Sequence, residues 1–228
     1  PNAPNIIRIV TTTAHQITFD WNPPKYSDGT VEDSNGYAIR LYDGVTEILI
    51  KTIHTPATWF VRAPSKVLTT TIGSLLGSKS YKFEISMKNS VGQSEFTPKK
   101  TGQTAPPTKA AVPDQIAVPL HLITESTCVV SFQVEHNGGA VLSGFTIEFT
   151  IESSASNTCS RTWTGVCQGE SCPSTDISIP AVDILNRRAT VIGLKGGTKY
   201  IFRVKSTNAV GTSAASEVSS VVQTVLLN

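Results

Sequence analysis

The chain has 228 residues, of which 39% are hydrophobic and 16% charged, and its formal net charge is +2. This length predicts two domains, and the apolar content excludes a disordered chain. Lysine and arginine occur at most in pairs, which excludes the basic stripe of a nucleic-acid-binding protein, and no long apolar run could insert into a membrane. Because the chain starts at Pro1 without a leader, we expect a fragment of a longer protein.

The first half of the chain contains three runs in which apolar and polar residues alternate. The apolar members are Ile17, Phe19 and Trp21, then Tyr37, Ile39 and Leu41, and finally Tyr81, Phe83, Ile85 and Met87. The polar positions within the third run are Lys82, Glu84, Ser86 and Lys88. A period of two predicts strands with one face in a core and the other in water.

The second half of the chain repeats this pattern. Its alternating apolar residues are Cys128, Val130, Phe132 and Val134, then Phe145, Ile147 and Phe149, and finally Tyr200, Phe202 and Val204. A single shift aligns Leu75, Tyr81, Asn89 and Gly92 with Leu194, Tyr200, Asn208 and Gly211. An internal repeat of this kind indicates two similar all-β domains.

These motifs resemble the fibronectin type III family over nearly the whole chain, twice. The family pattern has a Trp late in the second strand, then Pro-Pro, then Gly-Tyr, and it closes with Leu-x5-Tyr and Asn-x2-Gly. The first half keeps every element, including Trp21, Leu75 and Tyr81. The second half keeps Leu194 and Tyr200, places Phe132 and Phe145 at the Trp and Tyr positions, and lacks Pro-Pro.

The resemblance implies an all-β fold of two immunoglobulin-like (fibronectin type III) seven-stranded β-sandwiches in tandem. We expect domain 1 over residues 1–104, a Pro-rich linker over 105–113, and domain 2 over 114–228 with an insertion near 165–188. Tyr81 and Tyr200 would be tyrosine corners, with hydroxyls bonded to backbone a few residues upstream.

Three of the four cysteines lie in residues 157–175, which raises the question of a metal, a redox motif or a disulfide. Their spacing does not match a zinc site, and Cys128 takes a core position, so no metal is expected. A disulfide between Cys167 and Cys172 would close a short loop inside the insertion, and a bridge between Cys128 and Cys159 is a second candidate. Either bridge would indicate an oxidising compartment.

No constellation of catalytic residues is visible, so we expect no enzyme activity, no cofactor and no small-molecule ligand. A Thr-Trp pair occurs in each half, and the expected position on the fourth strand makes Trp59 and Trp163 candidate partner contacts, although packing against their own domain is the alternative. The insertion at 165–188 is a further candidate partner site.

The resemblance therefore implies a non-catalytic spacer and protein-interaction or adhesion module of a larger extracellular or cell-surface protein, with a protein partner. One alternative is an intracellular scaffold segment of the muscle or cilium type. Another is an accessory module of a secreted carbohydrate-active enzyme. The disulfides, if present, separate the intracellular alternative from the other two.

The cysteine hypothesis predicts the intact mass of the chain under non-reducing conditions. Two disulfides remove four hydrogens, so the mass should lie about 4 Da below that of the reduced chain. High-resolution mass spectrometry before and after reduction measures this difference. Four free thiols in a chain purified from an oxidising compartment would contradict both bridges.

Overall fold

The computed structural model describes residues 1–25, 34–56, 67–152, 164–166 and 182–226. The chain divides into two compact units, Pro1–Pro107 and Thr108–Asn228, so the boundary falls within the segment where the sequence predicts a linker. The N–H of Ala105 donates to Thr13 O in the first unit, and the N–H of Thr108 donates to Gly138 O in the second. None of the described helices is long and apolar enough to cross a membrane.

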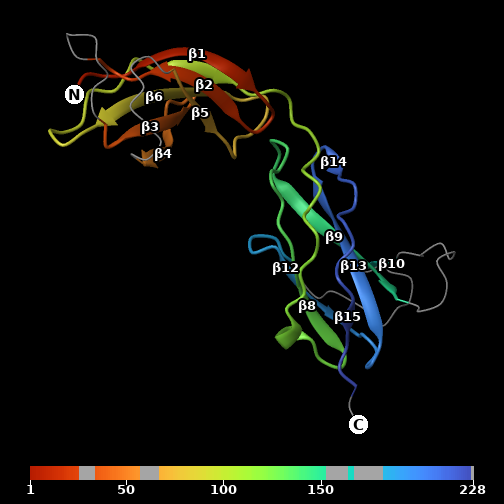
Figure 1. Cartoon of the computed structure of the whole chain (residues 1–228). Coiled ribbons are helices and arrows are strands. Elements are labelled where there is room, and N and C mark those ends of the chain that lie inside the picture. The colour runs from red at the N-terminus through yellow and green to blue at the C-terminus, as the bar shows by residue number, and fades with distance from the viewer. Residues whose placement is uncertain (26–33, 57–66, 153–163, 167–181, 227–228) are drawn as a thin grey trace. The chain divides into compact units, whose positions relative to one another are not determined.

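Unit 1 is a sandwich of two antiparallel sheets (Figure 1). The smaller sheet has the order β1-β2-β5, formed by Asn5–Thr12, Ile17–Asn22 and Leu68–Ile72. The larger sheet has the order β4-β3-β6-β7, formed by Leu49–Pro56, Gly36–Asp43, Ser80–Lys88 and Lys100–Gln103. Both sheets bury their alternating apolar residues in a common core.

Unit 2 has the same two-sheet plan with shorter outer strands. The order β11-β12-β8 joins Val182–Asp183, Arg188–Ile192 and Thr127–Ser131. The order β10-β9-β13-β14 joins Thr164–Val166, Leu142–Ile151, Lys199–Asn208 and Gly211–Thr212, and β15 (Val222–Gln223) also pairs with β13. Before β8 lie a 3-10 turn, η2 (Leu120–Leu122), and two isolated bridges, Ala117–Ser131 and Ile123–Cys128.

A pair of aromatic rings occupies the same place in both cores. Trp21 and Tyr37 pack edge to face with ring centroids 4.0 Å apart. Phe132 and Phe145 do the same at 4.7 Å, at the positions where the sequence aligns them with that pair. Edge-to-face contact brings the positive edge of one ring to the negative face of the other, so the exchange of ring types preserves the packing.

Each unit contains a tyrosine whose hydroxyl bonds to backbone five residues upstream. The N–H of Leu76 donates to the Tyr81 hydroxyl at 2.9 Å, and the N–H of Lys195 donates to the Tyr200 hydroxyl at 2.9 Å. Both rings are buried, so the bond ties the loop ahead of each central strand to the core.

Hydroxyl side chains replace regular strand pairing along one edge of the central strand β13. The N–H groups of Ser206, Val204 and Phe202 each donate at 3.0 Å, in turn to the Oγ atoms of Ser213, Ser216 and Ser219. Each of these serines returns its own N–H to the carbonyl of the same β13 residue at 2.8 Å. Residues 213–219 thus advance three positions for every two positions of β13. Their hydroxyl groups satisfy buried backbone groups of β13 that would otherwise lack partners.

Unit 1 uses the same arrangement beside β6. The N–H of Met87 donates to Ser94 Oγ at 2.9 Å, and the N–H of Ile85 donates to Thr97 Oγ1 at 3.1 Å. Ser94 and Thr97 return their N–H groups to the carbonyls of Met87 and Ile85. We call these two segments, residues 94–97 and 213–219, the hydroxyl ladders.

The outward face of β6 differs from the expectation of a face in water. Glu84 is 9% exposed and Ser86 is fully buried. The Gln93 side chain donates to Ser86 Oγ at 2.7 Å, and Glu84 accepts from a neighbouring tyrosine. Burial is tolerated here because the Glu84 carboxylate and the Ser86 hydroxyl both have hydrogen-bond partners.

The hydroxyl ladder predicts a specific cost for Ser216→Ala. The substitution leaves the buried N–H of Val204 without its acceptor, which should lower the free energy of unfolding of unit 2 by about 1–3 kcal/mol. Ser220→Ala is the matched control, because Ser220 is exposed and lies outside the ladder. Calorimetry of the full chain should show a lower unfolding temperature for the first variant only. Equal unfolding temperatures for the two variants would contradict the role of the ladder.

Candidate interaction surface

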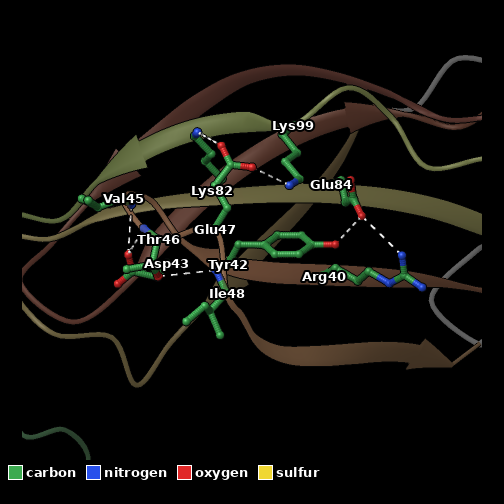
Figure 2. Close-up of polar contacts among 10 residues, drawn as sticks. All are labelled: Arg40, Tyr42, Asp43, Val45, Thr46, Glu47, Ile48, Lys82, Glu84 and Lys99. Carbon is green, nitrogen blue, oxygen red and sulfur yellow. Dashed lines mark hydrogen bonds and ion pairs between the residues drawn. The ribbon is translucent and has the colours of Figure 1, made fainter.

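A cluster of charged and aromatic side chains lies on the outward face of the larger sheet of unit 1. We call it the outer-face cluster, and it consists of Arg40, Tyr42, Glu47, Lys82, Glu84, Phe96 and Lys99. Alternation along β3 and β6 places Arg40, Tyr42, Lys82 and Glu84 on this face, opposite the core. Figure 2 shows that the labelled members reach toward one another across the sheet.

Glu84 is the centre of one half of the cluster. The Tyr42 hydroxyl donates to Glu84 Oε1 at 2.6 Å, and Arg40 Nη1 lies 3.5 Å from the same oxygen (Figure 2). The Arg40 guanidinium also lies 3.9 Å above the centre of the Phe96 ring, a cation–π contact. Burial and the bond to the Glu84 carboxylate raise the pKa of Tyr42, so this phenol remains protonated as a donor.

Glu47 is the centre of the other half of the cluster. It accepts from Lys82 and from Lys99, the latter at 2.9 Å, and these hydrogen bonds lower its pKa to about 2 (Figure 2). Lys99 also lies 4.3 Å from the centre of the Tyr42 ring, so it links the two halves. Glu47 has a backbone φ of 57°, which is unusual for a residue with a side chain.

The turn that carries Glu47 is fixed by Asp43. The side-chain oxygen Oδ1 of Asp43 accepts from the N–H of Val45 at 3.0 Å and of Thr46 at 2.9 Å. These backbone hydrogen bonds, that of Thr46 first, lower the pKa of Asp43. The Asp side chain therefore acts as the local template of the hairpin between β3 and β4.

Unit 2 has the corresponding ion pair with its charges exchanged. In unit 1, Arg40 on β3 faces Glu84 on β6, whereas in unit 2 Glu148 on β9 faces Arg203 on β13. Glu148 accepts from Arg203 at 2.5 Å and from Lys205 at 2.7 Å. Burial alone would raise the pKa of Glu148, but these hydrogen bonds outweigh it and leave the pKa lowered.

The cysteines predicted to form disulfides fall mostly outside the described residues. Cys159, Cys167 and Cys172 all lie there, so both bridges stay predictions. Cys128 is fully buried on β8, and no described cysteine bridges to it. Burial raises the pKa of the Cys128 thiol to about 12, so in its reduced form this thiol is protonated.

The two tryptophans considered as partner contacts, Trp59 and Trp163, also lie outside the described residues. Of the insertion at 165–188, the structure describes residues 165–166 and 182–188, which include the end of β10 and all of β11. The remaining motif residues, Leu75 and Leu194, are buried in their respective cores.

Sequence reasoning missed the outer-face cluster. It assigned Glu84 to a solvated face, although Arg40 in a neighbouring run carries the opposite charge, a signal of a cross-strand pair. The contacts of Phe96 and Lys99 had no such signal, because both lie outside the alternating runs.

Other kinds of site are not apparent in the described part of the chain. A groove of about 260 Å³ lies beside the hairpin, lined by residues that include Leu41, Ile50, Leu75 and Tyr81. Its volume is below the range of about 300–1,000 Å³ that is usual for ligand pockets. Within the described ranges, no group of three or more His, Cys, Asp or Glu residues could hold a metal ion.

The fold and a match to a family model identify the class of protein. Residues 113–222 match the model of the fibronectin type III domain. Unit 1, outside this match, shares with unit 2 the two-sheet plan, the aromatic pair, the tyrosine corner and the hydroxyl ladder. Residues 113–222 therefore form a fibronectin type III domain, and unit 1 repeats its two-sheet plan, so the chain has the fold of two such domains in tandem. This match supports a role as a structural and interaction module.

Two solved structures from chicken are similar to this chain. The FN1–FN3 domains of chicken CNTN1 are 17% identical, and the match covers 99% of this chain and 68% of that chain with a TM-score of 0.36. A segment of two fibronectin type III domains from chicken tenascin is 13% identical, and the match covers 98% of this chain and 100% of that chain, also with a TM-score of 0.36.

The lowered pKa of Glu47 predicts a pH dependence that Glu47→Gln should remove. A carboxylate whose folded pKa lies below its ordinary value of 4.5 stabilises the fold above that value. This contribution is lost as the pH falls from about 4.5 to about 2. The difference in unfolding temperature between wild type and E47Q should therefore shrink over this range.

The control is Glu95→Gln, because the described residues form no ion pair with Glu95. Scanning calorimetry at several pH values compares the three proteins. A difference between wild type and E47Q that stays constant from neutral to acidic pH would contradict the ionic clamp.

Proposed function

We propose that this chain is a non-catalytic spacer and protein-interaction or adhesion module of a larger extracellular or cell-surface protein. Two kinds of observation support the proposal. The first is the tandem of fibronectin type III domains, an architecture suited to presenting surfaces rather than to enclosing a substrate. The second is the outer-face cluster, which carries the assignment of the partner-binding surface.

The composition of the outer-face cluster suits a protein partner. Arg and Tyr are enriched at the energetic centres of protein interfaces, and this cluster holds Arg40 and Tyr42 in fixed orientations. The side chains of Arg40, Lys82 and Lys99 remain 42%, 28% and 34% exposed, so they can still donate to a second protein. Because internal contacts already hold them in place, binding would cost little side-chain entropy.

The location outside the cell rests on the cysteines. The predicted Cys167–Cys172 bridge in the insertion requires an oxidising compartment, whereas an intracellular scaffold would keep both thiols reduced. The insertion at 165–188 remains a second candidate partner site. Full partner binding by a chain that lacks this insertion would contradict the insertion as a partner site.

Arg40→Gln should weaken partner binding by about ten-fold, because Gln keeps part of the stem but loses the guanidinium that contacts both Phe96 and a partner. The partner is first identified by photo-crosslinking of the labelled chain on intact cells. Its affinity for the purified variants is then measured by surface plasmon resonance.

The matched control is Lys88→Gln, which removes one exposed positive charge from the end of the same strand pair. Circular dichroism melting verifies that both variants are folded. Equal affinities for the two variants would place the partner site elsewhere, and detection of substrate turnover by the chain would contradict the non-catalytic role.

A further inference from the structure

The free edge of β4 in unit 1 has the features of a strand-pairing surface. β4 (Leu49–Pro56) pairs with β3 on one side, and no described strand pairs with its other side. At eight residues it is as long as its neighbour β3, and a long edge strand is a template for pairing with another chain.

The hydroxyl ladder determines which backbone groups of β3 face β4. Because Met87 and Ile85 direct their N–H and C=O groups to Ser94 and Thr97, these groups of β6 point away from β3. The direction of the backbone N–H and C=O groups alternates from one residue of a strand to the next, so the even-numbered residues of β6 bond to β3. In the observed register these pair with the even-numbered residues of β3, which leaves the odd-numbered ones to face β4.

The same reasoning identifies the outward groups of β4. The odd-numbered β3 residues Tyr37, Ile39 and Leu41 pair with Thr55, Ile53 and Lys51. The remaining residues of the regular part of β4, Thr52 and His54, therefore point their backbone N–H and C=O groups out of the free edge, whereas Ile50 lies at a register shift. No described residue supplies a hydrogen-bond partner for these outward groups.

The side chains around this edge are apolar and accessible. Ile48 is 67% exposed, Leu49 47% and Ile50 51%, a run of three large apolar residues at the start of β4. The single charged side chain of the strand, Lys51, is directed back to its own unit, where Nζ donates to Gly73 O at 2.9 Å. The charge that usually protects an edge strand is thus turned away from this one.

We propose that β4 pairs with β4 of a second copy of this chain, in an antiparallel arrangement with its two-fold axis at Thr52. In this register, Thr52 lies opposite Thr52 of the partner subunit and exchanges two backbone hydrogen bonds with it. Ile50, at the register shift of β4, lies opposite His54 of the partner subunit.

A second copy fits this edge because the strand is complementary to itself. The symmetric register places Lys51 opposite Ile53 of the partner subunit, so no like charges face one another. It also joins the two larger sheets into one continuous sheet through an isologous contact, the commonest form of protein dimer. A single pair of strands buries little surface, so the association is weak and depends on concentration.

Charge pairs introduced on the symmetry axis test this register. Thr52→Lys alone, and Thr52→Glu alone, each place a charge directly opposite its own copy, so each should weaken dimerisation by about five-fold or more. An equimolar mixture of the two variants should restore association as a heterodimer. Thr52→Pro removes the outward N–H at a position where an edge strand tolerates proline, and it should abolish dimerisation.

The measurement is sedimentation velocity of the full chain at concentrations up to about 1 mM. Thr11→Lys and Thr11→Glu on the edge strand β1 are the matched controls, because Thr11 is exposed and lies in the other sheet. These controls should dimerise as the wild type does. Melting curves verify that every variant is folded.

Three outcomes would overturn the proposal: a wild-type chain that stays monomeric, a dimer insensitive to T52P, or a T52K and T52E mixture that remains monomeric. A monomeric chain that binds an extended peptide along β4 would replace self-association with strand addition by another protein. The inference deepens the proposed role as an interaction module. Failure of this inference is distinguishable from failure of that role, because sedimentation is measured on the chain alone, and the Arg40 experiment keeps Thr52, the cross-strand neighbour of Arg40, unchanged.

Discussion

Both domains depend on one constraint: every backbone N–H and C=O of the buried central strand must be satisfied on both of its edges. For β6 and β13, one edge bonds to a regular neighbouring strand. The other edge relies in large part on hydroxyl side chains, Ser94 and Thr97 in unit 1 and Ser213, Ser216 and Ser219 in unit 2. Since an unpaired buried amide costs about 1–3 kcal/mol, these hydroxyl groups stabilise the central strand in the way that the carbonyl acceptors of a neighbouring strand would.

Cross-strand ion pairs balance the charges on the outward faces of the two larger sheets. The pair Arg40–Glu84 and the pair Glu148–Arg203 occupy equivalent cross-strand positions with opposite polarity. Exchange of the two charges preserves the attraction, because the Coulomb energy depends only on their product and separation. The two domains therefore share the fold but carry different charge patterns on the outward faces of their larger sheets.

The sequence contained enough information for the fold but little for the surface. Alternation and the aligned Tyr81 and Tyr200 led to the all-β tandem, because burial of an apolar face imposes a periodic pattern on the residues. Side-chain pairing follows no such period. Glu84 is buried on a nominally solvated face because Tyr42 and Arg40 reach it from another strand, about 40 positions earlier in the sequence. Such contacts depend on the register between strands, which alternation in one strand does not specify.

The edges of the larger sheets differ in how open they are to pairing. Along β13, the hydroxyl ladder advances three residues for every two of its neighbour, so its outer side does not present the regular spacing that another strand requires. β4 keeps regular pairing over residues 51–56, and its outward groups therefore retain strand spacing. In unit 1 the hydroxyl ladder satisfies the backbone of β6 on one side of the larger sheet. The strand at the opposite edge, β4, keeps its regular pairing. Association through backbone hydrogen bonds is thereby directed to β4 rather than to the laddered edge.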